Sequence, residues 1–405
     1  MSNSNFKSFL HGILPAMLLA VSVGQIYAFT NFAVDISEHI GASAKTIQWA
    51  FSLGIFFLGM GAAFFGKMVE KSIKASSVLG SLLFLAGMLV THYGVVAKIA
   101  PLVLVGYGVL IGLGTGIIYI TPVKTMMMWF PKRKALASAI PIIFFGLGST
   151  LATFLYTKFI PYGIEKVFLM FTAVYIAPLL AGVLLLKKPE GYDSATATGS
   201  ADFRYVKLLE SPFFIASWLF MFFNIAAGLC IIPLAKSLMS PEYTGYTPFV
   251  VTLFIGLAGV FNGGGRLVFA WASDKLSRRT KILFAISGVS VLSLVLCGVW
   301  PIAFGVSALL INMCYGAGFS VIPGILSDRF GMSDISKIHG AVLSAWGIAG
   351  LVGNQVALLF MDNGGVVLLL MFIAAVHVIN FIAPDWFMDR EMKKINKEKA
   401  AFGEN

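Results

Sequence analysis

The sequence predicts an all-α membrane protein that crosses the bilayer many times. Hydrophobic residues make up 58% of the 405 residues and charged residues only 12%, against about 25% in a typical soluble domain. The mean hydropathy is +0.89. A surface of this composition cannot be kept in water, so the sequence excludes a soluble enzyme, a secreted disulfide scaffold, a disordered protein and a nucleic-acid-binding module.

The individual spans follow from the apolar runs between charged or Pro/Gly-rich breaks. A bilayer-spanning helix needs about 20 apolar residues, and twelve runs meet this requirement. The first run is too long for a signal-peptide core and lacks a convincing cleavage site, so we interpret it as a span. The twelve predicted spans lie at residues 9–32, 47–69, 75–95, 100–129, 135–157, 167–186, 212–235, 247–273, 282–300, 302–327, 338–361 and 364–384.

Basic residues predict the orientation of these spans. With both termini in the cytoplasm, 22 of the 29 Lys and Arg side chains fall on the cytoplasmic side and five on the outer side, while Lys124 and Arg266 remain inside spans. This asymmetry follows the positive-inside rule and explains the net charge of +11 without a nucleic-acid partner. We therefore expect cytoplasmic termini, with the basic tail as a candidate contact for anionic lipid.

A polar segment divides the chain into two halves of six predicted spans each. Within it, Asp193–Ser200 has the composition of a flexible linker. The predicted domains are an N-terminal six-helix bundle at 1–186, a cytoplasmic linker at 187–211, a C-terminal six-helix bundle at 212–388 and a basic cytoplasmic tail at 389–405.

The loops after the second and the eighth span repeat one pattern of an acid followed by bases. The two acids are 204 positions apart, about half the chain. Short cytoplasmic loops are usually basic, but an acid at the same place in both halves indicates an internal repeat. The motif residues are Gly66, Glu70 and Lys71 in the first half and Asp274, Lys275 and Arg278 in the second.

Arg266 lies well inside the eighth predicted span, and no predicted span interior contains an Asp or Glu. A cation carrier and a carboxylate proton relay are therefore disfavoured. Asn262 lies one helical turn earlier on the same face, and three glycines between them allow a close neighbour. A guanidinium offers a carboxylate two parallel N–H donors, which lysine cannot reproduce. We predict that Arg266 binds an anionic substrate; the alternative is that it reaches the cytoplasm or helix-end carbonyls.

Other polar and aromatic residues in the spans are open to two interpretations. Lys124 is either structural, because lysine snorkels easily from near a helix end, or lines a pathway, and His339 is either structural or a titrating group. Tyrosine hydroxyls inside a bundle can donate to a carboxylate while their rings shape a small site, or they can simply pack. The three cysteines lie in apolar stretches without CxxC spacing, so we expect no metal and no cofactor. The aromatic candidates are Tyr27, Tyr119, Tyr315 and Phe319.

The repeated loops resemble the G-x-x-x-D-[RK]-x-G-[RK]-[RK] signature of the major facilitator superfamily. The sequence departs from it with Glu70 for Asp, Ala270 for Gly and no second glycine in either copy. The resemblance implies two six-helix bundles that rock around a central site by alternating access. It also implies that the motif residues latch neighbouring helices at the cytoplasmic face, and that the protein works as a monomer in the cell membrane.

Four passages resemble the oxalate/formate antiporter branch, which is related to the monocarboxylate transporters. They are Gly24–Tyr27, Trp129–Lys134, Gly265–Val268 with Ser273–Lys275, and His339–Gly340. In the oxalate carrier of this branch, an arginine in span 8 and a lysine in span 11 clamp the dianion. The resemblance carries the arginine over to Arg266 and the site aromatics to Tyr27, Tyr119, Tyr315 and Phe319, whereas the lysine position holds Trp346.

The single cation favours a monocarboxylate such as pyruvate, lactate or formate, because a second carboxylate would be poorly compensated in a low-dielectric site. We therefore predict a transporter of a small organic anion, with Arg266 as the carboxylate anchor. An oxalate/formate-type dicarboxylate exchanger and a sugar or multidrug facilitator are the alternatives. An enzyme is excluded because the spans contain no nucleophile, metal cluster or carboxylate pair. Coupling to protons or to a counter-anion stays open.

Overall fold

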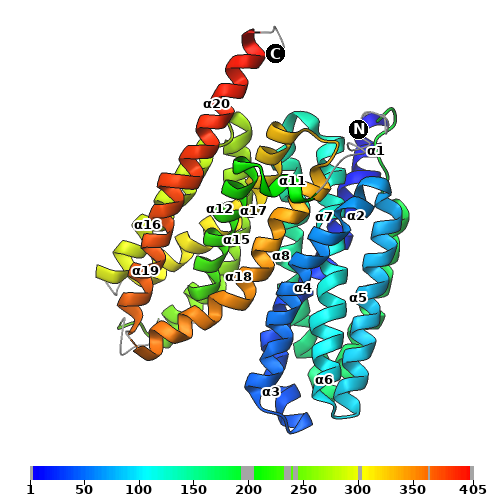
Figure 1. The fold of residues 1–405 in the computed structure, drawn as a ribbon. Coiled ribbons are helices and arrows are strands. Elements are labelled where there is room, and N and C mark those ends of the chain that lie inside the picture. Colours follow the sequence, from blue (N-terminus) through cyan, green and yellow to red (C-terminus); the bar gives the residue numbers. More distant parts are fainter. Residues whose placement is uncertain are drawn as a thin grey trace. The chain divides into compact units, whose positions relative to one another are not determined.

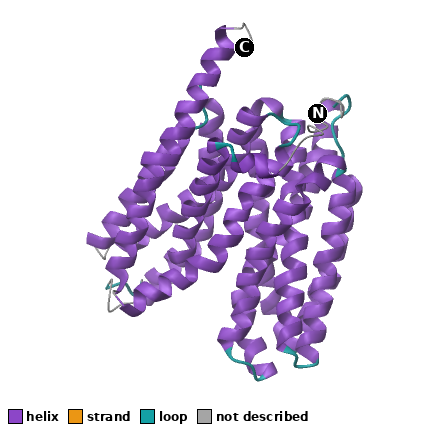
Figure 2. Cartoon of the chain, viewed as in Figure 1, coloured by secondary structure: helices purple, strands orange, loops and turns teal. Residues whose placement is uncertain are grey.

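The computed structural model describes residues 3–192, 205–231, 239, 245–299, 303–363 and 365–401. All regular secondary structure in these residues is helical, as the sequence predicts (Figure 2). The predicted linker stretch Asp193–Ser200 lies outside the described residues.

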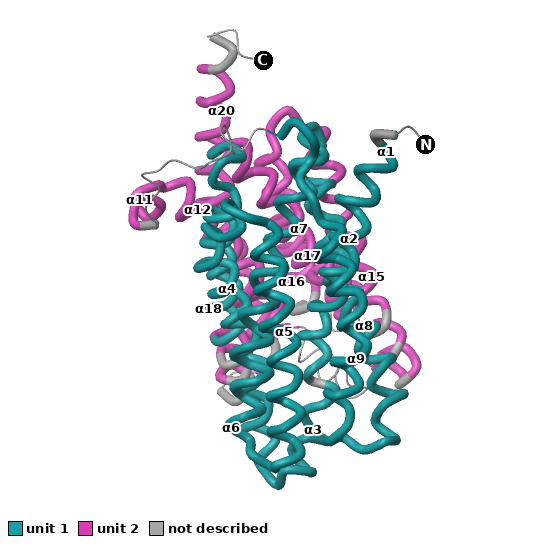
Figure 3. The backbone as a smooth tube through the Cα atoms, turned by 90° about the vertical axis from the view of Figure 1, so that its right-hand side faces the viewer, with its two compact units in different colours: residues 1–203, 330–351 teal, residues 204–329, 352–405 magenta. Residues whose placement is uncertain are grey.

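The helices form two compact units, residues 1–203 with 330–351 and residues 204–329 with 352–405 (Figure 3). The first unit contains α1 (Asn3–Ser8), η1 (Phe9–Ile13), α2 (Leu14–Val23), η2 (Gly24–Ala28), α3 (Phe29–Ile40), α4 (Ala44–Lys71), α5 (Ile73–Val96), α6 (Ala100–Val103), η3 (Leu104–Ile111), α7 (Gly112–Trp129), η4 (Pro131–Arg133), α8 (Lys134–Phe159), η5 (Ile160–Tyr162) and α9 (Ile164–Leu185). The second contains α11 (Tyr205–Leu209), α12 (Pro212–Ile231), α15 (Pro248–Lys275), α16 (Lys281–Val299), α17 (Phe304–Phe330), α19 (Gly365–Asn380), η7 (Phe381–Asp385) and α20 (Trp386–Ala401).

The long helix α18 (Ile335–Asn363; Figure 1) is shared, because its residues up to Leu351 belong to the first unit and the rest to the second (Figure 3). The predicted division into bundles 1–186 and 212–388 and a tail 389–405 stays a prediction.

Ten helical segments of the described residues are long and apolar enough to cross a membrane. In addition, α15 and α16 coincide with the predicted spans 247–273 and 282–300, although the apolar part of α16, Lys281–Leu296, is shorter. Every predicted span therefore overlaps a helix. The total of twelve crossings and the side of the termini stay predictions.

Glycines allow the helices of the first unit to approach closely. A Cβ atom added to Gly61 of α4 would lie 2.7 Å from the carbonyl oxygen of Leu113, and one added to Gly112 would lie 2.7 Å from the carbonyl oxygen of Gly54. These distances are too short for any side chain, so α4 packs against the η3–α7 segment backbone to backbone. Such contact replaces the hydrophobic driving force that helices lack in lipid.

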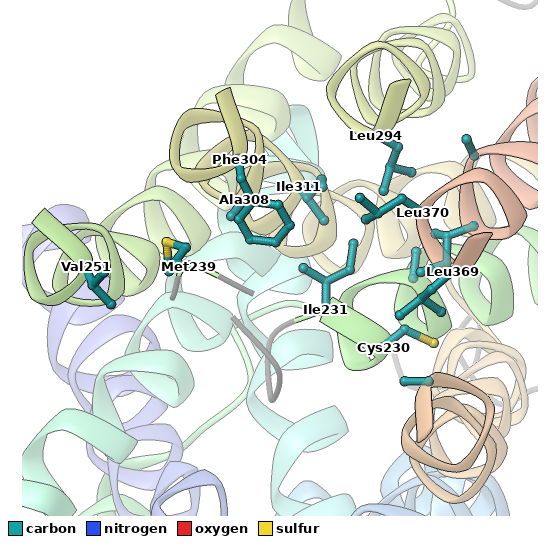
Figure 4. Packing of buried hydrophobic residues seen from close by; sticks show 14 residues of the cluster. Cys230, Ile231, Met239, Val251, Leu294, Phe304, Ala308, Ile311, Leu369 and Leu370 are labelled. Carbon is teal, nitrogen blue, oxygen red and sulfur yellow. The ribbon is translucent and has the colours of Figure 1, made fainter. Parts of the chain in front are cut away.

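The second unit has an apolar core between α12, α16, α17 and α19. Ile231, Leu294, Phe304 and Leu370 meet there from the four helices (Figure 4). Cys230 joins them as a buried free thiol and donates to the carbonyl of Gly353 at 3.1 Å. This thiol therefore has a structural contact.

Candidate functional site

Four aromatic rings gather in the first unit from four different elements. Tyr27 of η2 and Tyr119 of α7 each meet Phe145 of α8 edge-on, with ring centroids 5.5 Å and 5.2 Å apart. Trp346 of α18 lies 6.2 Å from Tyr27, 5.4 Å from Tyr119 and 5.9 Å from Phe145. The structure thus brings together the three aromatic residues of this unit that the sequence predicts for the substrate site. Their role in binding stays a prediction.

The sequence places Tyr27 in this cluster through a tightened turn. The helix changes from α to 3-10 geometry at Gly24–Ala28, and such a stretch inside a longer helix often marks a hinge or a strained site. The Tyr107 hydroxyl donates to the carbonyls of Gln25 and Ile26 at 3.3 and 3.1 Å. A Cβ atom on Gly24 would strike the carbonyl of Phe145. Gly24 therefore admits the backbone of α8, which sets Phe145 against Tyr27.

Arg266 lies on α15 in the second unit and is only 2% exposed. Its Nε donates to Asn262 Oδ1 at 2.9 Å, and the guanidinium carbon lies 5.4 Å from the centroid of the Phe319 ring. Phe319 in turn meets Tyr315 at 5.4 Å. The structure thus groups the four predicted residues of this unit, with the amide fixing one edge of the guanidinium and the ring covering a face.

Helix α17 approaches its neighbours through small residues at this place. A Cβ atom on Gly265 would lie 2.7 Å from Met313 Cγ, and one on Gly228 of α12 would lie 2.9 Å from Cγ of Tyr315. Gly263 and Gly264, by contrast, have no atom of the described residues within 4 Å of an added Cβ. Only one of the three glycines therefore serves helix packing.

Asn224 of α12 supports the same region and is not among the residues predicted from the sequence. It is 2% exposed, and its Nδ2 lies 3.4 and 3.3 Å from the carbonyls of Cys314 and Tyr315, to which it donates. An amide inside an otherwise apolar predicted span is a signal that the sequence does contain. Phe145 carries no comparable signal, because it is one of 36 phenylalanines.

The acid of the first loop motif is buried rather than solvent-facing. Glu70, in the last turn of α4, forms an ion pair with Lys124 of α7, and the side chains are 5% and 3% exposed. The other carboxylate oxygen accepts the Ser336 N–H at 2.6 Å in the first turn of α18. A Cβ atom on Gly66 would lie 2.6 Å from the carbonyl oxygen of Ser336. Glu70 therefore joins α4, α7 and the N-terminus of α18, where a carboxylate is favourable.

Lys124 therefore has a structural contact, in keeping with the first of its two interpretations, whereas a place on the substrate pathway stays a prediction. The ammonium is buried inside the first unit, where Glu70 holds it. Lys71, the next motif residue, is exposed. The partner of Lys124 lies 54 positions away, so local sequence could not reveal it.

The second loop motif forms ion pairs that tie three helices of the second unit. Asp274 accepts from Arg279 Nε at 2.9 Å, and Arg279 also pairs with Asp328 at the end of α17. The Lys275 ammonium lies 3.6 Å from the Trp271 ring centroid. The acid of the motif thus pairs with the second base of the Arg278–Arg279 run.

Arg278 reaches a different helix. Its Nε and Nη2 each donate to the Asp389 carboxylate of α20 at 2.9 Å, and Thr280 donates to the same carboxylate at 2.8 Å. The hydrogen bonds to Asp389 raise the pKa of Arg278 above its usual value. The predicted tail therefore begins as a helix anchored to the loop between α15 and α16.

Asp385 and His339 are two further buried titratable side chains. Asp385 sits at the end of the π-helical segment η7 and is 0% exposed, and the Ser287 hydroxyl of α16 faces its carboxylate. The sequence places it at a span end, yet the fold encloses it. His339 is also buried, and its ring lies 6.4 Å from that of Tyr119. In the described part of the chain, no three His, Cys, Asp or Glu side chains gather as metal ligands.

Comparison with known proteins decides the family. Residues 16–354 match the model of the Major Facilitator Superfamily. The chain belongs to this superfamily. It is therefore a multi-span membrane transporter and not an enzyme.

Two relatives support the branch that the sequence motifs indicate, and a third is similar at the level of the superfamily. The chain is 25% identical over 394 residues to the oxalate:formate antiporter of Oxalobacter formigenes, covering 95% of this chain and 92% of the relative. It is 24% identical to the uncharacterized MFS-type transporter YhjX of Escherichia coli, over 84% and 85% of the two chains. It is 21% identical to the apicoplast pyruvate carrier 1 of Toxoplasma gondii, over 59% and 56%. The resemblance to the oxalate/formate antiporter and monocarboxylate branch is thereby confirmed.

Among solved structures, the proton:xylose symporter XylE has a TM-score of 0.71 at 15% identity, and the match covers 94% of this chain and 95% of XylE. At this identity the likeness shows the fold alone.

Proposed function

We propose that the protein is a secondary active transporter that carries a small organic anion by alternating access, with Arg266 binding the carboxylate. The observation that carries this proposal is a guanidinium 2% exposed on α15 and oriented by Asn262 and Phe319. The paired N–H donors of a guanidinium match the two oxygens of a carboxylate, so bidentate binding is the geometry that we propose. Orientation by neighbouring groups before binding reduces the entropy lost on binding.

The substrate class that we propose is a monocarboxylate such as pyruvate, lactate or formate. Two features of the first unit support one cation instead of two. The position expected for a second cation holds Trp346, which packs among Tyr27, Tyr119 and Phe145. The other intramembrane cation, Lys124, is already neutralised by Glu70. The pyruvate carrier among the relatives is consistent with this class.

Dicarboxylate exchange is the second candidate function. It is favoured by the match to the oxalate:formate antiporter, which extends over 95% of this chain. A dianion would bring two charges to Arg266, and the second would remain without a close countercharge. We therefore place the monocarboxylate first.

The topology that we propose has twelve spans, both termini in the cytoplasm, and the cell membrane as location. It rests on the placement of 22 of the 29 basic residues on one side of the predicted spans. We also propose that the monomer is the working form and that Tyr27, Tyr119 and Trp346 line the substrate pathway. The coupled species is a proton or a counter-anion.

The test is uptake of radiolabelled formate, pyruvate, lactate and oxalate into proteoliposomes. Arg266→Lys keeps the charge but loses the paired donors, and charge-assisted hydrogen bonds are worth about 1.5–3 kcal/mol. We expect this variant to lower uptake of monocarboxylates by about 10- to 100-fold. The matched control is Arg133→Lys, the same substitution at an exposed residue of η4. Full uptake by Arg266→Lys would refute the anchor.

Trp346→Lys tests the assignment of the second position. It places a cation where the oxalate carriers have one, so we expect unlabelled oxalate to inhibit monocarboxylate uptake more strongly than in the wild type. Trp346→Phe adds no charge and should leave this inhibition unchanged. Unchanged oxalate competition in Trp346→Lys would remove Trp346 from the site.

A further inference from the structure

The last helix of the chain carries one exposed face whose chemistry changes abruptly. The chain runs from α19 through η7 into α20 without a break (Figure 1). Up to η7 the exposed side chains are apolar, among them Val378 and Ile382, and the exposed face reaches Trp386, which is 52% exposed. An apolar exposed face of this kind suits the hydrocarbon layer, and tryptophan is enriched at the boundary between hydrocarbon and headgroups.

Beyond Trp386 the same helix face becomes basic. Arg390, Lys393 and Lys397 are all exposed, and they follow Trp386 at intervals of four, seven and eleven residues, which align on one side of a helix. The Arg390 guanidinium carbon lies 5.1 Å from the centroid of the Trp386 ring. The first positive charge is therefore fixed one turn beyond the aromatic residue.

The opposite face holds the helix in this orientation. Met388 is fully buried, and its sulfur accepts a hydrogen bond from the Ser217 hydroxyl of α12 at 3.3 Å. Asp389 receives both Arg278 donors at 2.9 Å. These contacts lie within the second unit and prevent α20 from turning its basic face inward.

We propose that Trp386, Arg390, Lys393 and Lys397 form a binding surface for the headgroups of anionic phospholipids. The neighbouring exposed face of α19 and η7 is apolar, so the turn that follows it meets the headgroup layer. An ordinary soluble acidic partner would not need the tryptophan at the junction. Basic side chains close to an anionic leaflet contribute roughly fivefold in affinity each, and guanidinium and ammonium groups both bind phosphate oxygens.

Adjacent lysines provide a matched pair of variants. Both lysines are exposed. The Lys394 ammonium is partly compensated by the Glu391 carboxylate at 3.4 Å, whereas Lys393 has no carboxylate at ion-pair distance among the described residues. Lys393→Gln and Lys394→Gln therefore remove the same charge from neighbouring positions of one helix. A general attraction between a basic protein and an anionic lipid would respond equally to both.

The experiment titrates the full-length protein in neutral detergent with phosphatidylglycerol, phosphatidylcholine or inorganic phosphate and measures bound molecules by native mass spectrometry. We expect tighter binding of phosphatidylglycerol than of phosphatidylcholine. Lys393→Gln should lower the phosphatidylglycerol affinity about fivefold, and Arg390→Gln/Lys393→Gln/Lys397→Gln at least about tenfold, with Lys394→Gln within about twofold.

Three outcomes would overturn the proposal. They are equal binding of the two lipids, equal losses in Lys393→Gln and Lys394→Gln, and displacement of phosphatidylglycerol by inorganic phosphate alone, which would indicate a site for free phosphate. Trp386→Ala should also weaken phosphatidylglycerol binding, whereas Trp386→Tyr should retain it. Because the measurement is binding and not transport, its result is independent of Arg266 and of the substrate.

Discussion

Glu70 and Lys124 form a buried ion pair in the first unit. Replacing either residue alone should lower the free energy of unfolding more than replacing both together. Both side chains are at most 5% exposed, so neither charge can be solvated when the other is removed. Removing one partner of a buried ion pair typically costs about 3–5 kcal/mol, while replacing both by uncharged groups is often nearly neutral.

The hydrogen bond from the Ser336 N–H to Glu70 changes the expected loss of stability for each variant. In Lys124→Met, the Glu70 carboxylate keeps the Ser336 N–H bond, so we expect a loss at the lower end, about 3 kcal/mol. Glu70→Gln leaves the Lys124 ammonium without its countercharge, and we expect a loss of about 3 kcal/mol as well. In the double variant the glutamine amide oxygen still accepts from Ser336, so the loss should be about 1 kcal/mol.

The assay is the free energy of unfolding by sodium dodecyl sulfate in mixed micelles, measured for wild type, both single variants and the double variant. Lys71→Met is the control, because Lys71 neighbours Glu70 in sequence and is exposed; it should change the free energy by less than about 0.5 kcal/mol. Additive losses of about 6 kcal/mol in the double variant would refute the reasoning, because additivity means that the two charges do not compensate each other.

Two further predictions concern close packing and buried charge. Gly24→Ala should lower the free energy of unfolding by about 1–3 kcal/mol, because its Cβ would strike the Phe145 carbonyl. The measurement is thermal unfolding, and the control is Gly146→Ala, where an added Cβ meets no described atom within 4 Å. An equal loss in the control would show that the effect is not specific to Gly24. Asp385→Asn should be neutral or stabilising in the same assay, since an ionised carboxylate without a cation is costly to bury and the amide oxygen can still accept from Ser287. A loss above about 2 kcal/mol in Asp385→Asn would indicate that the carboxylate has a partner essential to the fold.

Much of the helical architecture is predictable from the chain alone, for a physical reason. Inside a bilayer every backbone polar group needs an internal partner, so an apolar run of sufficient length has few choices besides a helix. Composition therefore determines where the helices lie, and each of the twelve predicted runs does overlap one. The contact between Asn262 and Arg266 is predictable for a similar reason, because residues four apart in a helix are neighbours whatever surrounds them.

The polar contacts between helices are different. The sequence identifies Glu70 as part of a loop motif and Lys124 as a cation inside a span, but only the packing of α4 against α7 joins them. The bond from Ser336 to Glu70 crosses 266 positions, and the one from Arg278 to Asp389 crosses 111. Helical periodicity carries information over a few turns only, whereas these contacts depend on which helices pack together and at what height. The sequence by itself thus determines the helices and their charged positions, and the tertiary structure decides which charges meet.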